Sequence, residues 1–385
     1  MLFSMAGCAN TQTAESIKTA EDAEIVENFA QNREVNISQE LSYEGSMELV
    51  YADRFAIDYY ENDFTLLTIA SGEQYLIVPE GEEAPADLQE NIKILQQPIE
   101  DIYLVATAAM DMVCELEALD AIRFSSQRSD GWCREEASKA MEAGEILYAG
   151  KYNMPDYELI LSQGCSLAIE NNMISHSPEV IEKMESFGIP VFIDYSSYEN
   201  HPLGRVEWIK LYGALLQETE KAQEAFQKQV EILERVTAEE STGKTVAFFY
   251  ITTNGMVNVR VSTDYVPKMI ELAGGKYIFD NLGEEGTRRS SVTMQMEEFY
   301  SVAKDADYLI YNSNIDGEME SIEQLLEKDE ILEDFKALQE GNVWCITKNL
   351  YQQSMSIGVM IEDIHKMLSE DETQQEDMNY IFRVR

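Results

Sequence analysis

Apolar and polar residues alternate over the first strongly patterned part of the chain, residues 46–79. Apolar side chains recur at every second position or form short runs at these sites: Met47, Leu49 and Tyr51, then residues 64–69, and residues 75–78. A period of two is typical of strands that bury one face. The pattern predicts a small antiparallel meander.

Between residues 100 and 200 the pattern changes, because short apolar runs now alternate with amphipathic segments of about ten residues. The apolar runs predict strands at 102–106, 167–169 and 190–193, and the amphipathic segments predict helices at 108–119, 134–143, 155–163 and 178–187. Strands that alternate with helices of this length are typical of a mostly parallel, doubly wound sheet. We therefore expect a first α/β lobe, decorated by the meander.

The same alternation resumes after residue 244. It predicts strands at 246–250, 308–311 and 343–346, and helices at 266–273, 297–304, 331–339 and 358–368. Gly274 and Gly275 follow the first of these helices, and glycine commonly ends a helix. The second half of the chain therefore predicts a second α/β lobe.

One long helix is predicted between the two lobes. Residues 206–238 contain no proline and no glycine after Gly213, and their apolar residues recur at helical spacing. A helix of that length would extend about 45 Å, enough to reach both lobes. A helical hairpin inside one domain is the alternative, although the segment has no evident turn. The predicted divisions are a tether (1–40), a first lobe (41–205), an interdomain helix (206–240) and a second lobe (241–385). A cleft between two lobes is a common place for a small ligand to bind.

Length and charge narrow the class of protein. The chain has 385 residues, more than one typical domain, and 45% of them are hydrophobic, so two folded lobes are the natural division. It carries 28 basic against 72 acidic residues, which gives a formal net charge of -44. Nucleic acid and anionic membrane surfaces bind proteins through clustered lysine and arginine residues, which this chain lacks. Neither is therefore expected as a partner.

The sequence Met5-Ala6-Gly7-Cys8 resembles a bacterial lipobox, in which a signal peptidase cuts before a cysteine that then carries a lipid. Residues 9–40 are polar and acidic and lack apolar periodicity, as expected of a flexible tether. Lipidation at Cys8 would anchor the chain at the outer, extracytoplasmic face of the cytoplasmic membrane. The other cysteines have no CxxC spacing, and we expect them to be buried packing residues: Cys114, Cys133, Cys165 and Cys345. A disulfide between two of them is the alternative.

No catalytic residues are predicted. The chain lacks the GxSxG, GxxxxGK[ST] and GxGxxG motifs of hydrolases, NTPases and dinucleotide-binding enzymes. Pairs of carboxylates such as glycosidases use carry little information among 72 acidic residues, so a surface carbohydrate-active enzyme is kept only as an alternative. A lipid-anchored adhesion or scaffold protein is disfavoured by the two-lobed plan.

Metal-binding side chains are scarce. The only histidines are His176, His201 and His365, too few for a zinc or manganese site in which three or four ligands converge. Haem would need a single axial histidine or tyrosine, which His176 or His201 would satisfy. No bound metal and no resident cofactor are therefore predicted.

Several motifs resemble those of bacterial ABC-transporter substrate-binding proteins of the iron-siderophore, haem and cobalamin type. They are PDYELIL (155–161) and FGIPV (187–191) in the first lobe, with ELAGGK (271–276) and LQEGNV (338–343) in the second. The run YENHPLGRVEWIK (198–210) resembles a subgroup from anaerobic Gram-positive bacteria. The resemblance covers roughly residues 95–370. It implies two α/β lobes joined by one rigid helix, the class III form of the periplasmic-binding-protein fold.

The resemblance also implies partners. A protein of this type is a monomer that hands a small-molecule metal chelate to an importer, which consists of a permease dimer and its ATPase. One acidic residue on each lobe pairs with an arginine of the permease, because charge-assisted pairing at two points fixes orientation. By position the first acid is Glu158, and the second is Glu297 or Glu298. The implied cargo is an iron complex such as a siderophore, haem or a cobalamin-like chelate, with a zinc or manganese receptor of the same fold as the alternative.

The cargo site is expected in loops that follow the carboxyl ends of the strands, as in other open α/β sheets. In the first lobe and its exit this rule nominates Thr107, Arg123, Trp132, Tyr148, Lys151, Tyr152, Tyr195, Tyr198, His201 and Arg205. In the second lobe it nominates Tyr250, Arg260, Arg288, Arg289 and Tyr351. Arginine and aromatic side chains together suit a bulky, planar or catecholate-bearing anion, through stacking and bidentate pairing.

Overall fold

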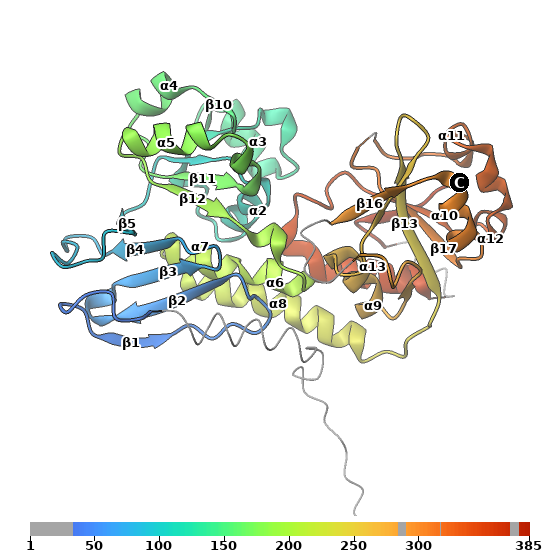
Figure 1. The fold of residues 1–385 in the computed structure, drawn as a ribbon, viewed down its shortest axis with the longest axis horizontal. Helices are drawn as coiled ribbons and strands as arrows, with labels where there is room; N and C mark the ends of the chain where they lie inside the picture. The colour runs from blue at the N-terminus through green and yellow to red at the C-terminus, as the bar shows by residue number, and fades with distance from the viewer. Residues whose placement is uncertain (1–33, 284–289, 316, 370–376) are drawn as a thin grey trace, which may run out of the picture.

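The structure is a computed structural model that describes residues 34–283, 290–315, 317–369 and 377–385. The predicted lipidation site Cys8 and the predicted cleft residues Arg288 and Arg289 lie outside the described residues. Two lobes lie side by side, and the first carries an additional sheet (Figure 1). The predicted α/β class is confirmed. Within the described ranges, every helix is too short or too polar to cross a membrane.

The additional sheet, called the N-terminal sheet from here on, has five strands in chain order. They are β1 (Tyr43–Ser46), β2 (Phe55–Tyr60), β3 (Thr65–Ile69), β4 (Gln74–Val78) and β5 (Ile92–Gln96). The pairs from β1 to β4 are antiparallel, as predicted, and β5 is parallel to β4. The strand predicted around Leu49 is wrong, because residues 47–54 are irregular. Side-chain carboxylates, and not a neighbouring strand, bind the backbone N–H groups at the end of this stretch.

The sheet of the first lobe is parallel throughout. Its strands are β6 (Ile102–Leu104), β7 (Ile122–Ser125), β8 (Leu147–Tyr148), β11 (Ala168–Asn171) and β12 (Val191–Asp194), in the order β12-β11-β6-β7-β8. Its helices are α2 (Thr107–Glu115), α3 (Glu135–Glu142), α4 (Tyr157–Ser162) and α5 (Pro178–Ser186). A two-stranded hairpin, β9 (Gly150–Lys151) and β10 (Met154–Pro155), precedes α4. The sequence pattern located β6, β11, β12 and the four helices to within a few residues, whereas β7, β8 and the hairpin were not among the predicted strands.

The second lobe has a mixed sheet of seven strands. They are β13 (Thr245–Ile251), β14 (Val257–Arg260), β15 (Lys276–Tyr277), β16 (Ser291–Met294), β17 (Tyr308–Tyr311), β18 (Val343–Ile346) and β19 (Ile381–Arg383). Strands β13, β15, β17 and β18 are parallel, and the antiparallel strands β14, β16 and β19 were not predicted. The helices are α9 (Tyr265–Leu272), α10 (Met296–Ala303), α11 (Ile322–Leu326), α12 (Lys336–Gln339) and α13 (Ile357–Leu368). The helix predicted at 331–339 is a 3-10 turn, η7 (Glu330–Asp334), followed by α12.

The two lobes repeat one strand order. In the first lobe β11 pairs with the first strand, β6, and with β12 on its other side. In the second lobe β17 likewise pairs with the first strand, β13, and with β18. Helix α4 precedes β11 and helix α10 precedes β17. Helices α4 and α10 are therefore equivalent elements of the two lobes.

The single helix predicted over residues 206–240 is three helices in the structure. They are α6 (Pro202–Glu207), α7 (Ile209–Leu215) and α8 (Thr219–Thr237). The chain turns at Gln217, whose φ of 60° is left-handed, and α7 packs against α8. Gly213 permits this close packing, since a Cβ there would lie 2.5 Å from the Cβ of Ala222. The segment therefore turns as a helical hairpin does, but the alternative of a hairpin inside one domain is met only in part, since α8 contacts both lobes.

Helix α8 still connects the two lobes. It contacts α6 and α7 on one side and α9 and α13 of the second lobe on the other (Figure 1). Its 19 residues extend about 28 Å, less than the predicted span. One hydrophobic cluster runs through the whole assembly, from Phe55 and Leu104 through Phe226 to Phe249. Separating the lobes would expose that cluster to water, so their relative position is fixed.

Candidate functional site

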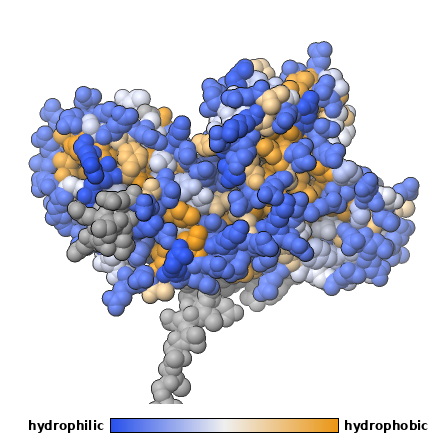
Figure 2. Space-filling model, turned by 180° about the vertical axis from the view of Figure 1, so that it is seen from behind, coloured by the Kyte–Doolittle hydropathy of each residue, from blue (hydrophilic) through white to orange (hydrophobic). Residues whose placement is uncertain are grey.

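The two lobes meet at the carboxyl ends of their strands, and Figure 2 shows the surface hollowed between them. Direct hydrogen bonds close the floor of this hollow. The side-chain amide of Gln352 donates to the carbonyl oxygen of Gly131 and accepts from the N–H of Cys133, both at 3.0 Å. The hydroxyl of Ser354 donates to the carbonyl oxygen of Ala108 at 3.0 Å. Loops that follow β6, β7 and β18 therefore form the base of the cleft.

Two arginines that come from opposite lobes lie at this junction. The guanidinium carbon of Arg205, on α6, lies 3.6 Å from the ring centre of Tyr265 at the start of α9. Arg260, the last residue of β14, donates from Nη2 to the hydroxyl of Tyr351 at 2.7 Å. We call these four residues the arginine–tyrosine cluster. Three of them, Arg205, Arg260 and Tyr351, were predicted from sequence, and the structure brings them together.

Asp264 is the carboxylate beside the cluster. Its Oδ2 lies 3.7 Å from Nη1 of Arg260, and its Oδ1 accepts the N–H of Val266 at the start of α9. Burial lowers the pKa of Arg205, and the neighbouring charge of Arg260 lowers it too, against the opposite influence of Tyr265, Asp264 and Glu199. The two guanidinium groups thus lie near more than one carboxylate, since Glu199 influences Arg205 as well. An anion bound at the cluster would be attracted by both guanidinium groups.

The first lobe contributes aromatic side chains beyond its strand ends. The guanidinium carbon of Arg128 lies 4.2 Å from the ring centre of Tyr148. Tyr195 and Tyr198 stack with ring centres 5.8 Å apart and planes inclined by 24°. The remaining predicted residues of this region are Thr107 and Tyr152, both half-buried, and Lys151, which is exposed. Tyrosine rings, partly covered by arginine or by each other, therefore occur on both lobes.

Trp132 lies in the floor of the cleft. Its side chain is 7% exposed, and its indole Nε1 is buried without a hydrogen-bond partner among the described residues. Both of its sequence neighbours bond the side chain of Gln352. Trp132 is therefore packed at the contact between the lobes, and its fluorescence is expected to report changes in the cleft.

Three of the predicted cargo contacts have other roles. Arg123 lies near the start of β7 and donates to the carbonyl oxygen of Glu145 at 2.6 Å, away from the carboxyl end of that strand. His201 caps α6 by accepting a backbone N–H on Nδ1, and its ring stacks on Tyr51 with centres 4.5 Å apart. Tyr250 lies inside β13, half-buried against the core. The prediction for Arg123 is wrong, because position along the sequence did not show at which end of the strand this side chain lies. A cargo contact of His201 or Tyr250 stays a prediction.

The run 198–210 holds the N-terminal sheet in place. Glu207 accepts the backbone N–H groups of residues 50–52 and pairs with Lys210 at 2.7 Å. Glu199 accepts the N–H groups of residues 53 and 54 and the indole N–H of Trp208 at 2.9 Å. We call Glu199 and Glu207 the carboxylate clamp. It ties the segment before β2 to helix α6 and so fixes the helix that carries the cleft arginine.

The predicted permease-contacting acids lie on the outer surface. Glu158 is exposed in the first turn of α4, at the tip of the first lobe (Figure 1). Glu297 and Glu298 are both exposed in the first turn of α10. Exposure alone therefore leaves the choice between the two residues of the second lobe open.

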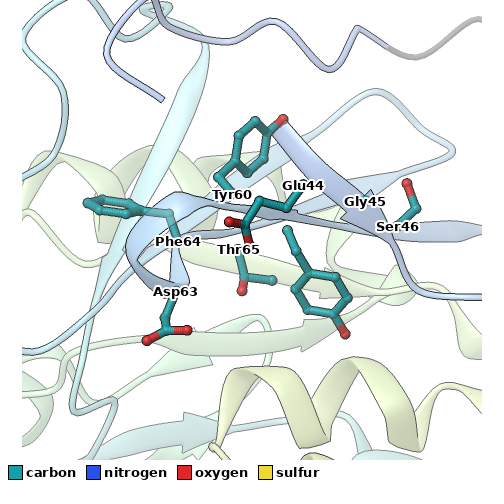
Figure 3. A pocket seen from close by; sticks show the side chains of 8 residues that line it. Glu44, Gly45, Ser46, Tyr60, Asp63, Phe64 and Thr65 are labelled. Carbon is teal, nitrogen blue, oxygen red and sulfur yellow. The ribbon is translucent and has the colours of Figure 1, made fainter. Parts of the chain in front are cut away.

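A cavity of about 400 Å³ lies on the N-terminal sheet, apart from the cleft (Figure 3). Its lining comes from β1, β2, the following turn and β3: Glu44, Gly45, Ser46, Tyr59, Tyr60, Asp63, Phe64 and Thr65. The lining contains no arginine or lysine and comes from one sheet only. This cavity is therefore distinct from the predicted cargo site.

Metal-ligating groups do not converge within the described residues. No group of three or more histidine, cysteine, aspartate or glutamate side chains there could hold a metal ion. Cys114, Cys133, Cys165 and Cys345 are free thiols, and Cys114 and Cys345 are buried. The structure contains no disulfide among these four cysteines, and packing accounts for the two buried ones.

The sequence pattern missed three residues of the site. Tyr265 and Asp264 begin α9, where an aspartate before an apolar helix usually indicates an N-cap alone. Arg128 follows β7 and therefore met the strand-end criterion, but the surrounding polar loop gave no reason to single it out. Tyr265 meets Arg205 only when the two lobes are placed together, whereas Arg128 lies over Tyr148 and Asp264 lies beside Arg260 within one lobe.

Two α/β lobes of repeated strand order, joined through a helix and meeting at their strand ends, define a two-lobed solute-binding protein. The chain belongs to the periplasmic binding protein family, whose family model matches residues 127–350. Members of this family bind solutes for transport and are not enzymes, in agreement with the prediction from sequence.

Two relatives are uncharacterized lipoproteins of the archaeon Methanocaldococcus jannaschii. One is 25% identical over 341 residues, which cover 83% of this chain and 79% of the relative. The other is 23% identical over 352 residues, which cover 87% of this chain and 86% of the relative. The likeness therefore includes much of the chain outside the family model.

Solved structures share the fold at low sequence identity. A possible iron-binding periplasmic solute-binding protein from Staphylococcus epidermidis matches with a TM-score of 0.55 at 12% identity, over 70% of this chain and 98% of that one. The periplasmic heme binding protein HutB of Vibrio cholerae matches with a TM-score of 0.56 at 15% identity, over 68% and 97%. A protein of an Fe3+-hydroxamate transport system from Saccharomonospora viridis matches with a TM-score of 0.54 at 17% identity, over 71% and 94%.

Proposed function

We propose that this protein captures an anionic iron chelate in the cleft between its lobes and delivers it to an ABC importer. The arginine–tyrosine cluster is the observation that carries the proposal. Arginine offers bidentate hydrogen bonds to carboxylate, hydroxamate or catecholate oxygens, and tyrosine rings supply flat surfaces for a planar ligand. The cluster combines both kinds of contact and lies where the lobes meet.

An anionic chelate fits the cleft better than a bare cation. Arg205 and Arg260 would repel free zinc or manganese, whereas they would attract the oxygens of a complexed metal. The solved relatives described above are an iron-binding, a heme-binding and an Fe3+-hydroxamate transport protein, and their ligands support the same class of cargo. The proposal covers siderophores, haem and cobalamin-like chelates as one class of large metal complexes.

We also propose that the chain is anchored by lipid at Cys8 outside the cytoplasm. The similarity to two lipoproteins and the sequence Met5-Ala6-Gly7-Cys8 support this. A lipid on Cys8 would keep the receptor next to its importer, which we expect to be a permease dimer with its ATPase. In cells that express the chain behind a complete leader, Cys8→Ser is expected to move the protein from the membrane fraction to the medium. Undiminished membrane retention would contradict lipidation at this residue.

A binding panel on the full chain tests the cargo. The panel contains ferric siderophores of the hydroxamate and catecholate classes, haemin, cobalamin and free Zn²⁺ or Mn²⁺, with tryptophan fluorescence as the readout. Saturable binding of one chelate supports the proposal, and haemin would also report its axial ligand in the absorption spectrum. Binding of free metal alone would instead identify a metal-ion receptor. No change in fluorescence with any of the chelates would refute the proposed cargo class.

Arg260→Met is expected to weaken chelate binding about 10- to 100-fold, because a charge-assisted hydrogen bond in a partly buried site contributes about 1.5–3 kcal/mol. Isothermal titration of the chelate identified by the panel measures the change. Arg123→Met is the matched control, since Arg123 is also an arginine of a strand but bonds the carbonyl oxygen of Glu145 away from the cleft. Equal losses of chelate affinity in Arg260→Met and Arg123→Met would show that the arginine–tyrosine cluster does not bind the cargo.

A further inference from the structure

A short segment of the second lobe, residues 352–355, binds directly to the first lobe. Besides the hydrogen bonds of Gln352 and Ser354 described above, the N–H of Met355 donates to Oδ2 of Asp111, on α2, at 2.7 Å. The partners in these bonds are 219 to 246 residues apart in the sequence, so the bonds form only when both lobes are folded. The segment therefore connects the lobes in addition to helix α8.

Gln352 holds one residue of the first lobe by the peptide groups on both sides of it. That residue, Trp132, has an extended backbone with φ of -97° and ψ of 133°. In an extended chain the carbonyl group of the preceding residue and the N–H group of the following residue point to the same side. A side-chain amide carries an acceptor and a donor together, so Gln352 binds both groups as a neighbouring strand would. A carboxylate would lack the donor, and an aliphatic side chain would lack both.

The backbone of Gln352 belongs to the turn that carries Tyr351. The N–H groups of Gln352 and Gln353 both donate to the carbonyl oxygen of Asn349, at 3.0 and 3.1 Å. Tyr351 lies inside this turn, and its hydroxyl accepts a hydrogen bond from Nη2 of Arg260 at 2.7 Å. The position of the hydroxyl, and with it the orientation of the Arg260 guanidinium, therefore depends on where Gln352 is held.

We infer that Gln352 is a positioning residue, which ties the turn of Tyr351 to the first lobe and so holds Arg260 in its binding orientation before the cargo arrives. The inference rests on the cargo role proposed above and deepens it, because it names a residue that governs affinity without contacting the cargo. An arginine that is already oriented loses little freedom on binding, so more of its attraction for the anion appears as affinity. Recognition by an arginine of the second lobe thus depends on hydrogen bonds to the first lobe.

The test is isothermal titration with the chelate that binds most tightly in the panel, whether a ferric siderophore, haemin or cobalamin. Gln352→Leu removes both hydrogen bonds to the first lobe, and we expect affinity to fall about tenfold because Arg260 must then be ordered during binding. Ser354→Ala is the matched control, since it removes another hydrogen bond of the same segment while Asp111 still holds the N–H of Met355. The control is expected to change affinity by less than about twofold.

A double-mutant cycle tests whether Gln352 acts through Tyr351. Tyr351→Phe removes the hydroxyl that binds Arg260 and keeps the ring. Without that hydroxyl the position of Gln352 no longer orients the guanidinium, so adding Gln352→Leu to Tyr351→Phe is expected to lower affinity by less than about twofold. A loss of stability alone would not produce this coupling. Urea unfolding of each variant establishes that it is folded under the conditions of the titration.

The outcomes separate this inference from the proposed function. If the unaltered chain binds none of the chelates, the proposed cargo role is wrong and the inference fails with it. If the unaltered chain binds a chelate and Gln352→Leu binds it equally well, the proposed function stands and the inference alone is wrong. Losses that simply multiply in the double variant would show that Gln352 acts independently of Tyr351. An equal loss in Ser354→Ala would show that general contact between the lobes, and not the amide of Gln352, sets the affinity.

Discussion

Replacing Glu207 with alanine is expected to destabilise the protein by about 4 kcal/mol, because breaking a buried ion pair on one side typically costs 3–5 kcal/mol. Glu207 is fully buried, accepts three backbone N–H groups of residues 50–52 and pairs with buried Lys210. Its removal leaves the ammonium group and the N–H groups without their acceptor. Urea unfolding of the variant measures the loss.

The N-terminal sheet is expected to be affected first. The carboxylate clamp connects the segment before β2 to α6, so hydrogen exchange should show β1 and β2 opening before the strands of either lobe. Glu231→Ala is the control, since Glu231 is an exposed glutamate of α8 and its removal should change stability by less than about 0.5 kcal/mol. Similar losses in the two variants would contradict the role given to Glu207.

Glu170→Gln is expected to remove a large pH dependence of stability. Glu170, on β11, is buried in the first lobe, and neither carboxylate oxygen has a hydrogen-bond partner among the described residues. Burial raises its pKa from 4.5 to about 8. The groups that face it are the phenols of Tyr103 and Tyr157, and neither carries a compensating positive charge.

The direction in which stability changes with pH follows from the protons that the folded and unfolded chains bind. Between pH 4.5 and 8 the folded protein keeps a proton on Glu170 that the unfolded chain has released, so this group lowers stability as pH rises through that interval. From pH 5 to pH 8 the loss amounts to about 3 kcal/mol, at 1.36 kcal/mol per pKa unit. Glutamine cannot ionise, so the variant is expected to be more stable than the unaltered chain at pH 8 and to differ little at pH 5.

Urea midpoints from pH 5 to pH 9 measure this effect. Burial also raises the pKa of Asp111 to about 6 and that of Glu199 to about 8, so the unaltered chain and the variant share those contributions and only their difference reports Glu170. Glu182→Gln, at an exposed position of α5, is expected to keep the pH dependence of the unaltered chain. An unchanged pH dependence in Glu170→Gln would show that the carboxyl group is already ionised or solvated.

Sequence periodicity predicted β6, β11, β12, β13, β17 and β18 well, because these parallel strands are buried and read as continuous apolar runs. It missed the short parallel strands β7, β8 and β15. It failed at β14, β16 and β19, the antiparallel strands near the edges of the second sheet. It also failed at residues 47–54, where Glu199 and Glu207, some 150 residues later in the chain, determine the backbone conformation. Contacts of that sequence separation leave no local pattern.

The length of the interlobe helix was overestimated for a related reason. Residues 209–237 are helical in composition throughout, and the turn at Gln217 requires neither glycine nor proline. The small side chains of Gly213 and Ala222 permit the hairpin, but their meaning depends on the packing of α7 on α8. The length of a helical pattern therefore gave only an upper limit to the helix.

The candidate site was predicted in part. The strand-end rule selected Tyr351, which follows the predicted parallel strand β18, because topology places the carboxyl ends of parallel strands at one edge. It also named Arg205 and Arg260, although Arg205 lies on helix α6 and Arg260 ends β14, an antiparallel strand that was not predicted. The rule also selected Arg123, which lies near the start of β7 and bonds the carbonyl oxygen of Glu145, because the sequence did not define the bounds of that strand. Tyr265 was not recognised, because its contact with Arg205 joins two lobes that are folded from separate parts of the chain.

The hydrophobic cluster that runs through α8 and both lobes has a kinetic consequence for capture. A receptor whose lobes cannot swing apart does not wait for an opening motion, so encounter with the chelate sets the rate of association. Affinity for different chelates should then vary mainly through the dissociation rate, which depends on the arginine and tyrosine side chains that each chelate engages. In a frame of this kind, a change of cargo requires new side chains at the strand ends while the apolar interior remains the same.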